Sequence, residues 1–337
     1  MMTTTVKALM THVAPGLHST RCTNKVSVIG AGTVGTAIAF SLLAQNITSE
    51  LVLIDKNESL ARGEMLDIQH ATMYLNSPQI SSSSDYATTH DSKIVIVTAG
   101  SQNVGAGKIE CTARQNTDIF KEIIPKVVTQ SPDCILIIVS QPVDIMTYIA
   151  WKLSDLPPYR VIGAGTILDS ARFRYLIAQR LEVEPSTCQA FIIGEYGRKS
   201  VPVWSAVSVS GVRLREVNPN LGTDDDPEDW QEIHKQVVES NIEVCKLKHA
   251  GSWGMALSIS RLVRAITEDL RECFPISTHI KGCRHGVDKD VFLSLPCIIG
   301  SSGVVNIVRQ NLSDLEKDMI QKSADYMNEL QKKLMDR

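Results

Sequence analysis

The chain has 337 residues, of which 43% are apolar and 21% are charged, a balance typical of a globular protein that buries a large core. This length suits two domains or one large α/β unit. The formal net charge of −3 offers no basic excess for nucleic acid. The apolar stretches are far shorter than the roughly 18 residues of a membrane span. These properties argue against a disordered chain, a membrane span and a nucleic-acid-binding surface.

The eight cysteines are scattered along the chain without a C-x-x-C pair. They predict neither a disulfide framework nor a zinc site, so no metal is expected, and they suit a reducing compartment such as the cytoplasm. Residues 1–24 contain no continuous apolar segment, and we expect them to form an extended surface arm. Their serines, threonines and two basic residues also weakly resemble a mitochondrial presequence, which leaves the mitochondrion as the alternative location.

Strand and helix patterns alternate through the first half of the chain. Short apolar runs predict strands over Lys25–Ile29, Leu51–Ile54, Ile94–Val97 and Ile135–Val139. Helical patterns lie between them over Thr33–Gln45, Glu58–His70 and Thr117–Thr129. Strands that alternate with helices favour a parallel sheet with helices on both faces, which right-handed crossovers turn into a doubly wound fold.

The second half of the chain is more mixed. Its predicted elements are strands at Arg160–Ile162 and Phe191–Ile193 and helices over Ser170–Leu181, Gln231–Lys248 and Ser313–Leu334. The serine run Ser81–Ser84 is interpreted as a low-complexity linker, and there is no internal repeat. We therefore expect a first domain over residues 25–163 and a second, mixed α/β domain over residues 164–337.

A G-x-G-x-x-G run from Gly30 to Gly35 follows the first strand and opens the first helix. Gly30 suits the tight turn, Gly32 lets the backbone approach a pyrophosphate, and Gly35 lets the helix pack close to the strand. The helix N-terminus attracts the negative charge of the phosphates. Asp55, at the end of the next strand, can accept hydrogen bonds from ribose hydroxyls and would repel a 2′-phosphate. The pattern predicts a Rossmann domain that binds NAD rather than NADP.

Six further segments resemble animal L-lactate dehydrogenases, and their sequences are most similar to those of insect members. They are Gly63–His70, Pro142–Tyr148, Leu168–Arg174, Ser200–Ser205, His234–Val238 and Val291–Cys297. The match implies a lactate/malate dehydrogenase-like fold, in which a Rossmann domain precedes a substrate-binding domain. It also implies NAD, a homotetramer in which the N-terminal arm reaches a neighbouring subunit, and hydride transfer between nicotinamide and L-lactate or pyruvate. The resemblance adds cofactor-binding positions at Thr33, Val34, Thr98, Ala99, Gly100 and Val139.

The resemblance also assigns the catalytic positions, and here the chain departs from the family. Asp169 matches the aspartate of the family's histidine–aspartate pair. Arg172 matches the arginine that binds the substrate carboxylate, whose planar fork suits bidentate contact. The family's Gly-Glu-His-Gly-Asp is Gly-Glu-Tyr-Gly-Arg here, so Tyr196 stands at the position of the proton-transferring histidine. We expect its side chain to fill the histidine's space and its hydroxyl to hydrogen-bond Asp169.

Other positions of the substrate site are also changed. Ile109 replaces the arginine on the family's mobile loop that polarises the ketone, and Asn103 replaces a glutamine that contacts the substrate side chain. Gln141 stands for an asparagine that orients the ketone oxygen, and Gly251 stands for a threonine. With Arg172 retained beside Asn103, Gln141 and Gly251, the resemblance still implies a small 2-oxo or 2-hydroxy acid as the ligand.

Two routes could restore catalysis. A small register shift of the loop would bring the Lys108 ammonium to the ketone, and Lys199 or Arg198 would lower the pKa of Tyr196 enough for it to donate a proton. Without such a rescue, the missing histidine and arginine predict an impaired L-lactate dehydrogenase. The alternatives are a non-catalytic NAD-binding or regulatory subunit that assembles with active relatives, and a dehydrogenase of another 2-hydroxy acid. Malate is disfavoured because the loop offers no arginine for a second carboxylate.

Overall fold

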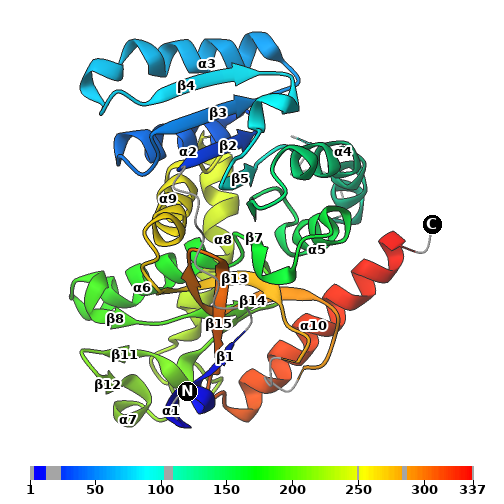
Figure 1. Ribbon diagram of the computed structural model, residues 1–337. Coiled ribbons are helices and arrows are strands. Elements are labelled where there is room, and N and C mark those ends of the chain that lie inside the picture. The colour runs from blue at the N-terminus through cyan, green and yellow to red at the C-terminus, as the bar shows by residue number, and fades with distance from the viewer. Residues whose placement is uncertain (1–3, 13–23, 102–108, 249, 283–286, 336–337) are drawn as a thin grey trace.

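The computed structural model describes residues 4–12, 24–101, 109–248, 250–282 and 287–335, and Figure 1 shows their arrangement. Among these residues, six parallel strands form the centre of the first half: β2 (Lys25–Ile29), β3 (Glu50–Ile54), β4 (Gln79–Ser83), β5 (Ile94–Val97), β6 (Ile135–Ile138) and β7 (Val161–Gly163). They lie in the order β4-β3-β2-β5-β6-β7, so the direction of winding reverses between β2 and β5. The expected doubly wound parallel sheet is confirmed.

Helices cover both faces of this sheet. The connections between its strands contain α2 (Thr33–Ala44), α3 (Glu58–His70), α4 (Ile109–Gln130) and α5 (Val143–Ser154), with the short turns η1 (Thr72–Tyr74), η2 (Tyr86–Thr89) and η3 (Pro158–Arg160). In Figure 1, α4 and α5 pack together on one side of the strands, and α2 packs with α9 (Trp253–Thr267) on the other. Because both faces are covered, the central strands β5 and β6 consist of buried valine, isoleucine and leucine.

The second half continues the same sheet with antiparallel strands. These are β13 (Glu272–His279), which pairs with β7, β14 (Phe292–Gly300), β15 (Gly303–Val308), and the hairpin of β9 (Ile192–Gly194) and β10 (Ser200–Pro202), which joins β14. A small sheet holds β8 (Cys188–Gln189), β11 (Ser208–Val209) and β12 (Val212–Arg213).

The helical elements of this half are α6 (Ile167–Leu181), η4 (Pro185–Thr187), η5 (Trp204–Ala206), α7 (Leu214–Val217), α8 (Gln231–Lys248) and α10 (Asp314–Met335). The expected mixed α/β architecture is therefore confirmed. Within the described ranges, no helix is both long and apolar enough to span a membrane.

Residues 4–12 lie against the main sheet instead of extending away from it. α1 (Thr4–Leu9) leads into β1 (Met10–His12), which pairs antiparallel with β15. The Leu9 carbonyl accepts a hydrogen bond from the Arg309 amide at 2.6 Å. An extended surface arm is therefore the wrong description of this part, because the edge of β15 offers backbone partners to it.

Two other expectations are wrong. The serine run Ser81–Ser84 falls largely within the parallel edge strand β4 rather than in a linker, because its backbone pairs with β3. The helix α4 begins at Ile109 rather than near Thr117. Its first turns bury Thr112 and Asn116 instead of large apolar side chains, so the sequence shows no apolar stripe there.

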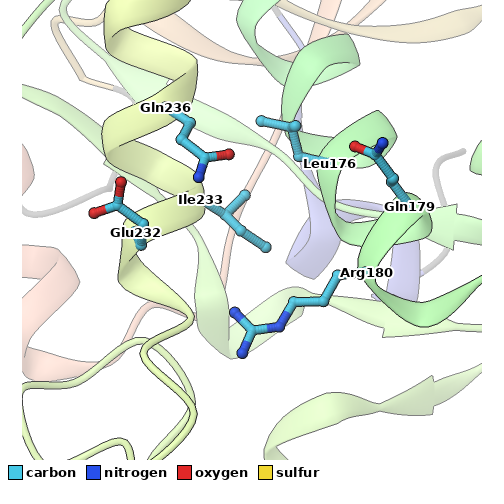
Figure 2. Close-up of a pocket in the computed structure, with 6 residues that line it drawn as sticks. All are labelled: Leu176, Gln179, Arg180, Glu232, Ile233 and Gln236. Atoms are coloured by element: carbon cyan, nitrogen blue, oxygen red, sulfur yellow. The ribbon is translucent and has the colours of Figure 1, made fainter.

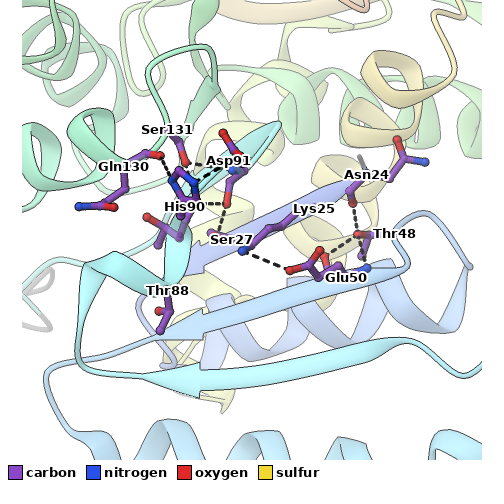
Figure 3. A network of polar contacts seen from close by, with 12 residues as sticks. Asn24, Lys25, Ser27, Thr48, Glu50, Thr88, His90, Asp91, Gln130 and Ser131 are labelled. Carbon is purple, nitrogen blue, oxygen red and sulfur yellow. Dashed lines mark hydrogen bonds and ion pairs between the residues drawn. The ribbon is translucent and has the colours of Figure 1, made fainter. Parts of the chain in front are cut away.

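A polar network closes the amino end of the parallel strands (Figure 3). The buried Ser92 hydroxyl donates to the Thr89 carbonyl at 2.6 Å and lies 2.7 Å from the Ser27 hydroxyl. The Ser131 hydroxyl also donates to the Thr89 carbonyl at 2.6 Å. In doubly wound folds, ligands bind at the opposite, carboxyl end of the parallel strands.

Candidate functional site

The glycine-rich turn lies where the winding of the sheet reverses, at the carboxyl ends of β2 and β5. Gly30 has a φ of +104°, and a Cβ on it would lie 2.7 Å from the Thr98 hydroxyl, so the turn needs glycine. A Cβ on Gly35 would lie 1.9 Å from the Gly30 carbonyl oxygen, so α2 packs as closely on the turn as the motif requires. The Thr98 hydroxyl donates to the Gly30 carbonyl at 2.9 Å and ties the two strand ends together.

Asp55 follows β3 and is half-buried beside the same turn. Its Oδ2 accepts the Ala31 amide hydrogen at 2.8 Å, and its Oδ1 accepts the Asn57 amide hydrogen at 2.8 Å. Both donors belong to the backbone, so they fix the carboxylate whatever side chains surround it. Each oxygen keeps a lone pair for a sugar hydroxyl, while the negative charge would repel an added phosphate.

The turn leaves room for a phosphate at the start of α2. No described atom lies within 4 Å of a Cβ built on Gly32, and no described side chain caps the helix, so its first amide groups at Thr33 and Val34 can meet an anion. The other positions expected to contact the cofactor follow β5 and β6: Thr98, Ala99, Gly100 and Val139. These residues fit a dinucleotide such as NAD, whose nicotinamide accepts or supplies a hydride when bound.

Asp169 and Arg172 lie one turn apart on α6 and form an ion pair that is largely buried. Arg172 Nη1 donates to Asp169 Oδ1 at 2.8 Å, and the two side chains are 18% and 6% exposed respectively. Burial raises the pKa of Asp169 to about 6, although the charge and hydrogen bond of Arg172 lower it. Because a guanidinium has five N–H donors, the pair leaves donors for a carboxylate ligand.

Tyr196 lies on the turn between β9 and β10, and its hydroxyl reaches this ion pair. The Arg172 guanidinium lies near enough to this hydroxyl to act on its pKa. The expected hydrogen bond from the Tyr196 hydroxyl to Asp169 is wrong. The Asp169 carboxylate pairs with the Arg172 guanidinium, because a charged donor binds it more strongly than a neutral phenol does. Burial raises the pKa of the Tyr196 hydroxyl, the Asp169 charge raises it further, and Arg172 lowers it only in part. Lys199, one of the two cations considered as a means of lowering this pKa, does not act on the hydroxyl; its ammonium lies 5.1 Å from the Tyr326 ring centroid.

The turn that carries Tyr196 is held by a buried aspartate to which the sequence patterns gave no role. Asp144 Oδ2 accepts the Tyr196 amide hydrogen at 2.8 Å, and its Oδ1 accepts the Ser277 hydroxyl hydrogen at 2.5 Å. Burial raises the pKa of Asp144 to about 7, against the lowering effect of these two hydrogen bonds. The sequence offered one signal for this role, because Asp144 is a carboxylate within the apolar run that follows Pro142.

A second unpredicted residue, Asn116 of α4, joins two turns next to the site. Its Oδ1 accepts the Ser101 amide hydrogen at 2.7 Å, and its Nδ2 donates to the Gln141 carbonyl at 2.6 Å. The Gln141 side chain folds toward the start of α5, where its Oε1 accepts the Val143 amide hydrogen at 3.2 Å. The side-chain oxygen of Gln141 is therefore engaged at the start of α5. This oxygen is part of the amide that was expected to face the substrate.

The remaining predicted positions are less enclosed. Ile109 begins α4 and is 47% exposed, so an apolar side chain faces water at the position matched to the loop arginine. Gly251 is half-buried in the connection between α8 and α9. Asn103 and Lys108 lie outside the described residues. In the part of the chain that the structure describes, no group of three or more His, Cys, Asp or Glu side chains could hold a metal ion.

A cavity of about 260 Å³ lies between α6 and α8. Figure 2 shows the side chains that line it, Leu176, Gln179 and Arg180 from α6 and Glu232, Ile233 and Gln236 from α8. The Arg180 guanidinium carbon lies 4.3 Å from the Trp230 ring centroid, and its nitrogens donate to the Glu228 and Asp229 carbonyls. The charge of Arg180 is thus already engaged, and the cavity lies at the opposite end of α6 from Asp169.

Known proteins share this arrangement of the chain. Residues 24–163 match the family model of the lactate/malate dehydrogenase NAD binding domain, and residues 166–336 match that of the lactate/malate dehydrogenase alpha/beta C-terminal domain. The L-lactate dehydrogenase A chain of Columba livia is 51% identical over 312 residues, which cover 92% of this chain and 93% of its own length. The L-lactate dehydrogenase B chain of Sceloporus undulatus is 47% identical over 336 residues, 99% of each chain. The B chain of Homo sapiens is 48% identical over 314 residues, 93% of each chain. The chain therefore belongs to the lactate/malate dehydrogenase family, with NAD as its cofactor.

Proposed function

We propose that this chain is an NAD-dependent L-lactate dehydrogenase in fold and ligands but a slow one in catalysis. Its ligands would be small 2-hydroxy and 2-oxo acids, with Arg172 as the cation that binds their carboxylate. The observation that carries the proposal is the burial of the Tyr196 hydroxyl beside the ion pair of Arg172 and Asp169. In this interpretation, a phenol with a raised pKa stands where the reaction needs a group that exchanges a proton near pH 7.

The proton step accounts for the largest part of the proposed deficit. Oxidation of L-lactate needs a base for the hydroxyl proton, and reduction of pyruvate needs an acid. Histidine does both near neutral pH because its ordinary pKa is about 6.5. The buried Tyr196 hydroxyl keeps its proton across that range. A positioned acid–base group contributes about 10²- to 10⁴-fold in rate, so this one replacement predicts a large loss.

The charges around the proposed substrate have changed as well. Arg172 already donates to Asp169, so a substrate carboxylate would share it with another acceptor. Its remaining donors still allow binding. At Ile109 the side chain carries no cation to stabilise the negative charge that develops on the ketone oxygen. Loss of one such donor costs about 10²- to 10³-fold in rate.

Pyruvate reduction by NADH at pH 7, together with an NADH titration, tests this proposal. We expect saturable NADH binding at micromolar concentration and turnover well below about 1 per second, the lower end of ordinary enzymes. Tyr196→Phe is the matched variant, because it removes only the hydroxyl, and it should change turnover little. Turnover of several per second in the unmodified protein that Tyr196→Phe abolishes would refute the proposal, since the phenol would then be the acid.

A regulatory subunit that assembles with active relatives is the second candidate, and an apolar surface favours it. Phe40 on α2 and Trp253 and Leu257 on α9 are 51%, 63% and 61% exposed, and the two helices pack against each other. Exposed apolar patches of this kind mark protein–protein interfaces. We propose a homotetramer or a mixed oligomer that covers this surface. Light scattering at micromolar concentration should give a mass well above that of one chain, and a persistent monomer would contradict it.

A dehydrogenase of another 2-hydroxy acid is the third candidate. The missing side chain at Gly251 favours it, because a different substrate could occupy that space. For all three candidates the cytoplasm is the proposed location, since the cysteines of the described residues are free thiols, which suit a reducing compartment. The mitochondrion is the alternative location.

A further inference from the structure

The space beside Gly251 is bounded by a polar side chain of α8. A Cβ built on Gly251 would lie 3.3 Å from Asn241 Oδ1 and 3.5 Å from Val244 Cγ1. A larger side chain at residue 251 would therefore crowd the Asn241 amide. With glycine at residue 251, the space next to it is bounded by the Asn241 amide and not by a larger side chain of residue 251. This amide can form hydrogen bonds.

Another residue on the face of α8 that carries Asn241 acts on the proposed catalytic group. Cys245 follows Asn241 by one helical turn, so the two side chains share a face of the helix. Cys245 lies close enough to Tyr196 to act on the pKa of its hydroxyl. The start of α9 also packs on α6 next to the ion pair, because a Cβ on Gly254 would lie 2.9 Å from Leu168 Cδ1. Asn241 and Gly251 thus belong to the walls around the proposed substrate site.

The amide of Asn241 is half-buried, and no hydrogen bond joins it to another residue of the described ranges. A ligand that displaced water from this amide without replacing its hydrogen bonds would lose affinity. We infer that Asn241 is a specificity-determining residue that favours 2-oxo acids with a hydroxyl or another uncharged polar group on the carbon chain. This inference rests on the proposed function, since it concerns the same substrate site.

The preference for an uncharged group follows from the charges at the site. Asp169 and Arg172 neutralise each other, and the carboxylate of a 2-oxo acid adds one negative charge. A second carboxylate on the substrate would place an unpaired charge next to a neutral amide, which is costly in a partly buried site. A hydroxyl, in contrast, can donate to Asn241 Oδ1 or accept from its Nδ2. A methyl group of the same size can do neither.

Hydroxypyruvate and 2-oxobutyrate form a matched pair for the test, because they differ by a hydroxyl in place of a methyl group. The ratio of kcat/KM for the two acids is measured with saturating NADH, or the ratio of Kd by calorimetry where turnover is too slow. We expect Asn241→Leu, which keeps the branching at Cγ but removes the amide, to shift this ratio away from hydroxypyruvate by about 3- to 10-fold. Glu243→Gln, on the exposed side of α8, is the control and should leave the ratio unchanged.

The readouts separate this inference from the proposed function. If both acids bind and the ratio is the same in the unmodified protein and in Asn241→Leu, the inference is overturned while 2-oxo acid binding stands. If neither these acids nor pyruvate bind to the NADH-loaded protein, the proposed function fails and the inference fails with it. Asn241→Ala is a second variant in which the same shift is expected. NADH affinity and melting temperature of each variant show whether α8 remains intact.

Discussion

The two halves of this molecule hold their sites by different means. In the cofactor half, the contacts run through the backbone: Gly30 makes the turn, and Asp55 is fixed by two amide hydrogens. In the substrate half, side chains contact side chains, as Arg172 does with Asp169. A site built on backbone groups survives changes in its neighbours, whereas a site built on side chains changes its chemistry with each substitution. This difference explains how NAD binding can persist beside an altered substrate half.

Restoring both lost groups should give the largest effect. Tyr196→His returns an imidazole beside Asp169, and Ile109→Arg returns a cation to the start of α4. We expect the double variant to reduce pyruvate at least about 10²-fold faster than the unmodified protein. The gain should also exceed the product of the two single gains, because both groups act on one ketone. The assay is NADH loss at pH 7 with saturating cofactor. A double variant that folds and binds NADH but reduces pyruvate no faster would contradict the view that the substrate half has lost its catalytic groups.

The buried carboxylate behind the Tyr196 turn should make stability depend on pH. Because the folded protein raises the pKa of Asp144 to about 7, its contribution to stability is full below its unfolded pKa and is lost as pH rises through 7. Asp144→Asn removes this titration. We expect its free energy of unfolding, relative to the unmodified protein, to rise by about 2 kcal/mol between pH 5 and pH 8. Urea unfolding at both pH values measures it, and a constant difference would contradict the prediction.

Arg172→Lys should separate the two halves directly. Lysine keeps the charge but loses the planar fork, so we expect the Kd for pyruvate in the presence of NADH to rise about 10-fold. NADH affinity itself should not change, since the cofactor contacts lie on other elements. Arg198→Lys, at an exposed position of the turn after β9, is the matched control. Equal pyruvate affinity in both variants would exclude Arg172 as the carboxylate-binding residue.

Asp55→Ala should give a loss of about 10-fold in NADH affinity, because hydrogen bonds to a charged group are lost. The preference for NADH over NADPH should fall with it, since the repulsion of the 2′-phosphate disappears. Asp55→Asn sharpens the comparison: it keeps an acceptor for the Ala31 amide but removes the charge. It should therefore retain more NADH affinity than Asp55→Ala while losing the preference over NADPH. Fluorescence titration with each cofactor tests both variants.

Local signals made the first half readable from the sequence. The glycine run fixed the place of the turn, and the helix expected over Glu58–His70 has those bounds in the structure. The long antiparallel strands of the second half were not predicted. β13 and β14 carry Pro275 and Pro296 opposite each other, and proline weakens any strand pattern because it cannot donate to a ladder. The sequence pattern therefore does not indicate that these two strands pair, and the folded structure shows it.

The same contrast between local signals and distant contacts applies to the functional site. Resemblance to a family identified Asp169, Arg172 and Tyr196 by position, but it could not say which atoms pair. Arg172 pairs with the Asp169 carboxylate, and no motif encodes that a charged partner is preferred there to the neutral phenol. Asp144 and Asn116 were missed because their partners lie far away in the chain, and a polar residue inside an apolar run shows its role only through those partners.

The junction between the two halves is itself a pairing of strands, and this limits how the protein can move. β13 meets β7 at Ser277 opposite Gly163, where a Cβ would lie 2.3 Å from the Thr147 hydroxyl and 2.7 Å from the Ser277 Cβ. Ser277 also donates to Asp144, which holds the Tyr196 turn. A hinge at this seam would separate paired strands and unseat that aspartate. The seam therefore ties the position of the Tyr196 turn to the pairing of the two halves, so a change at Ser277 would reach both.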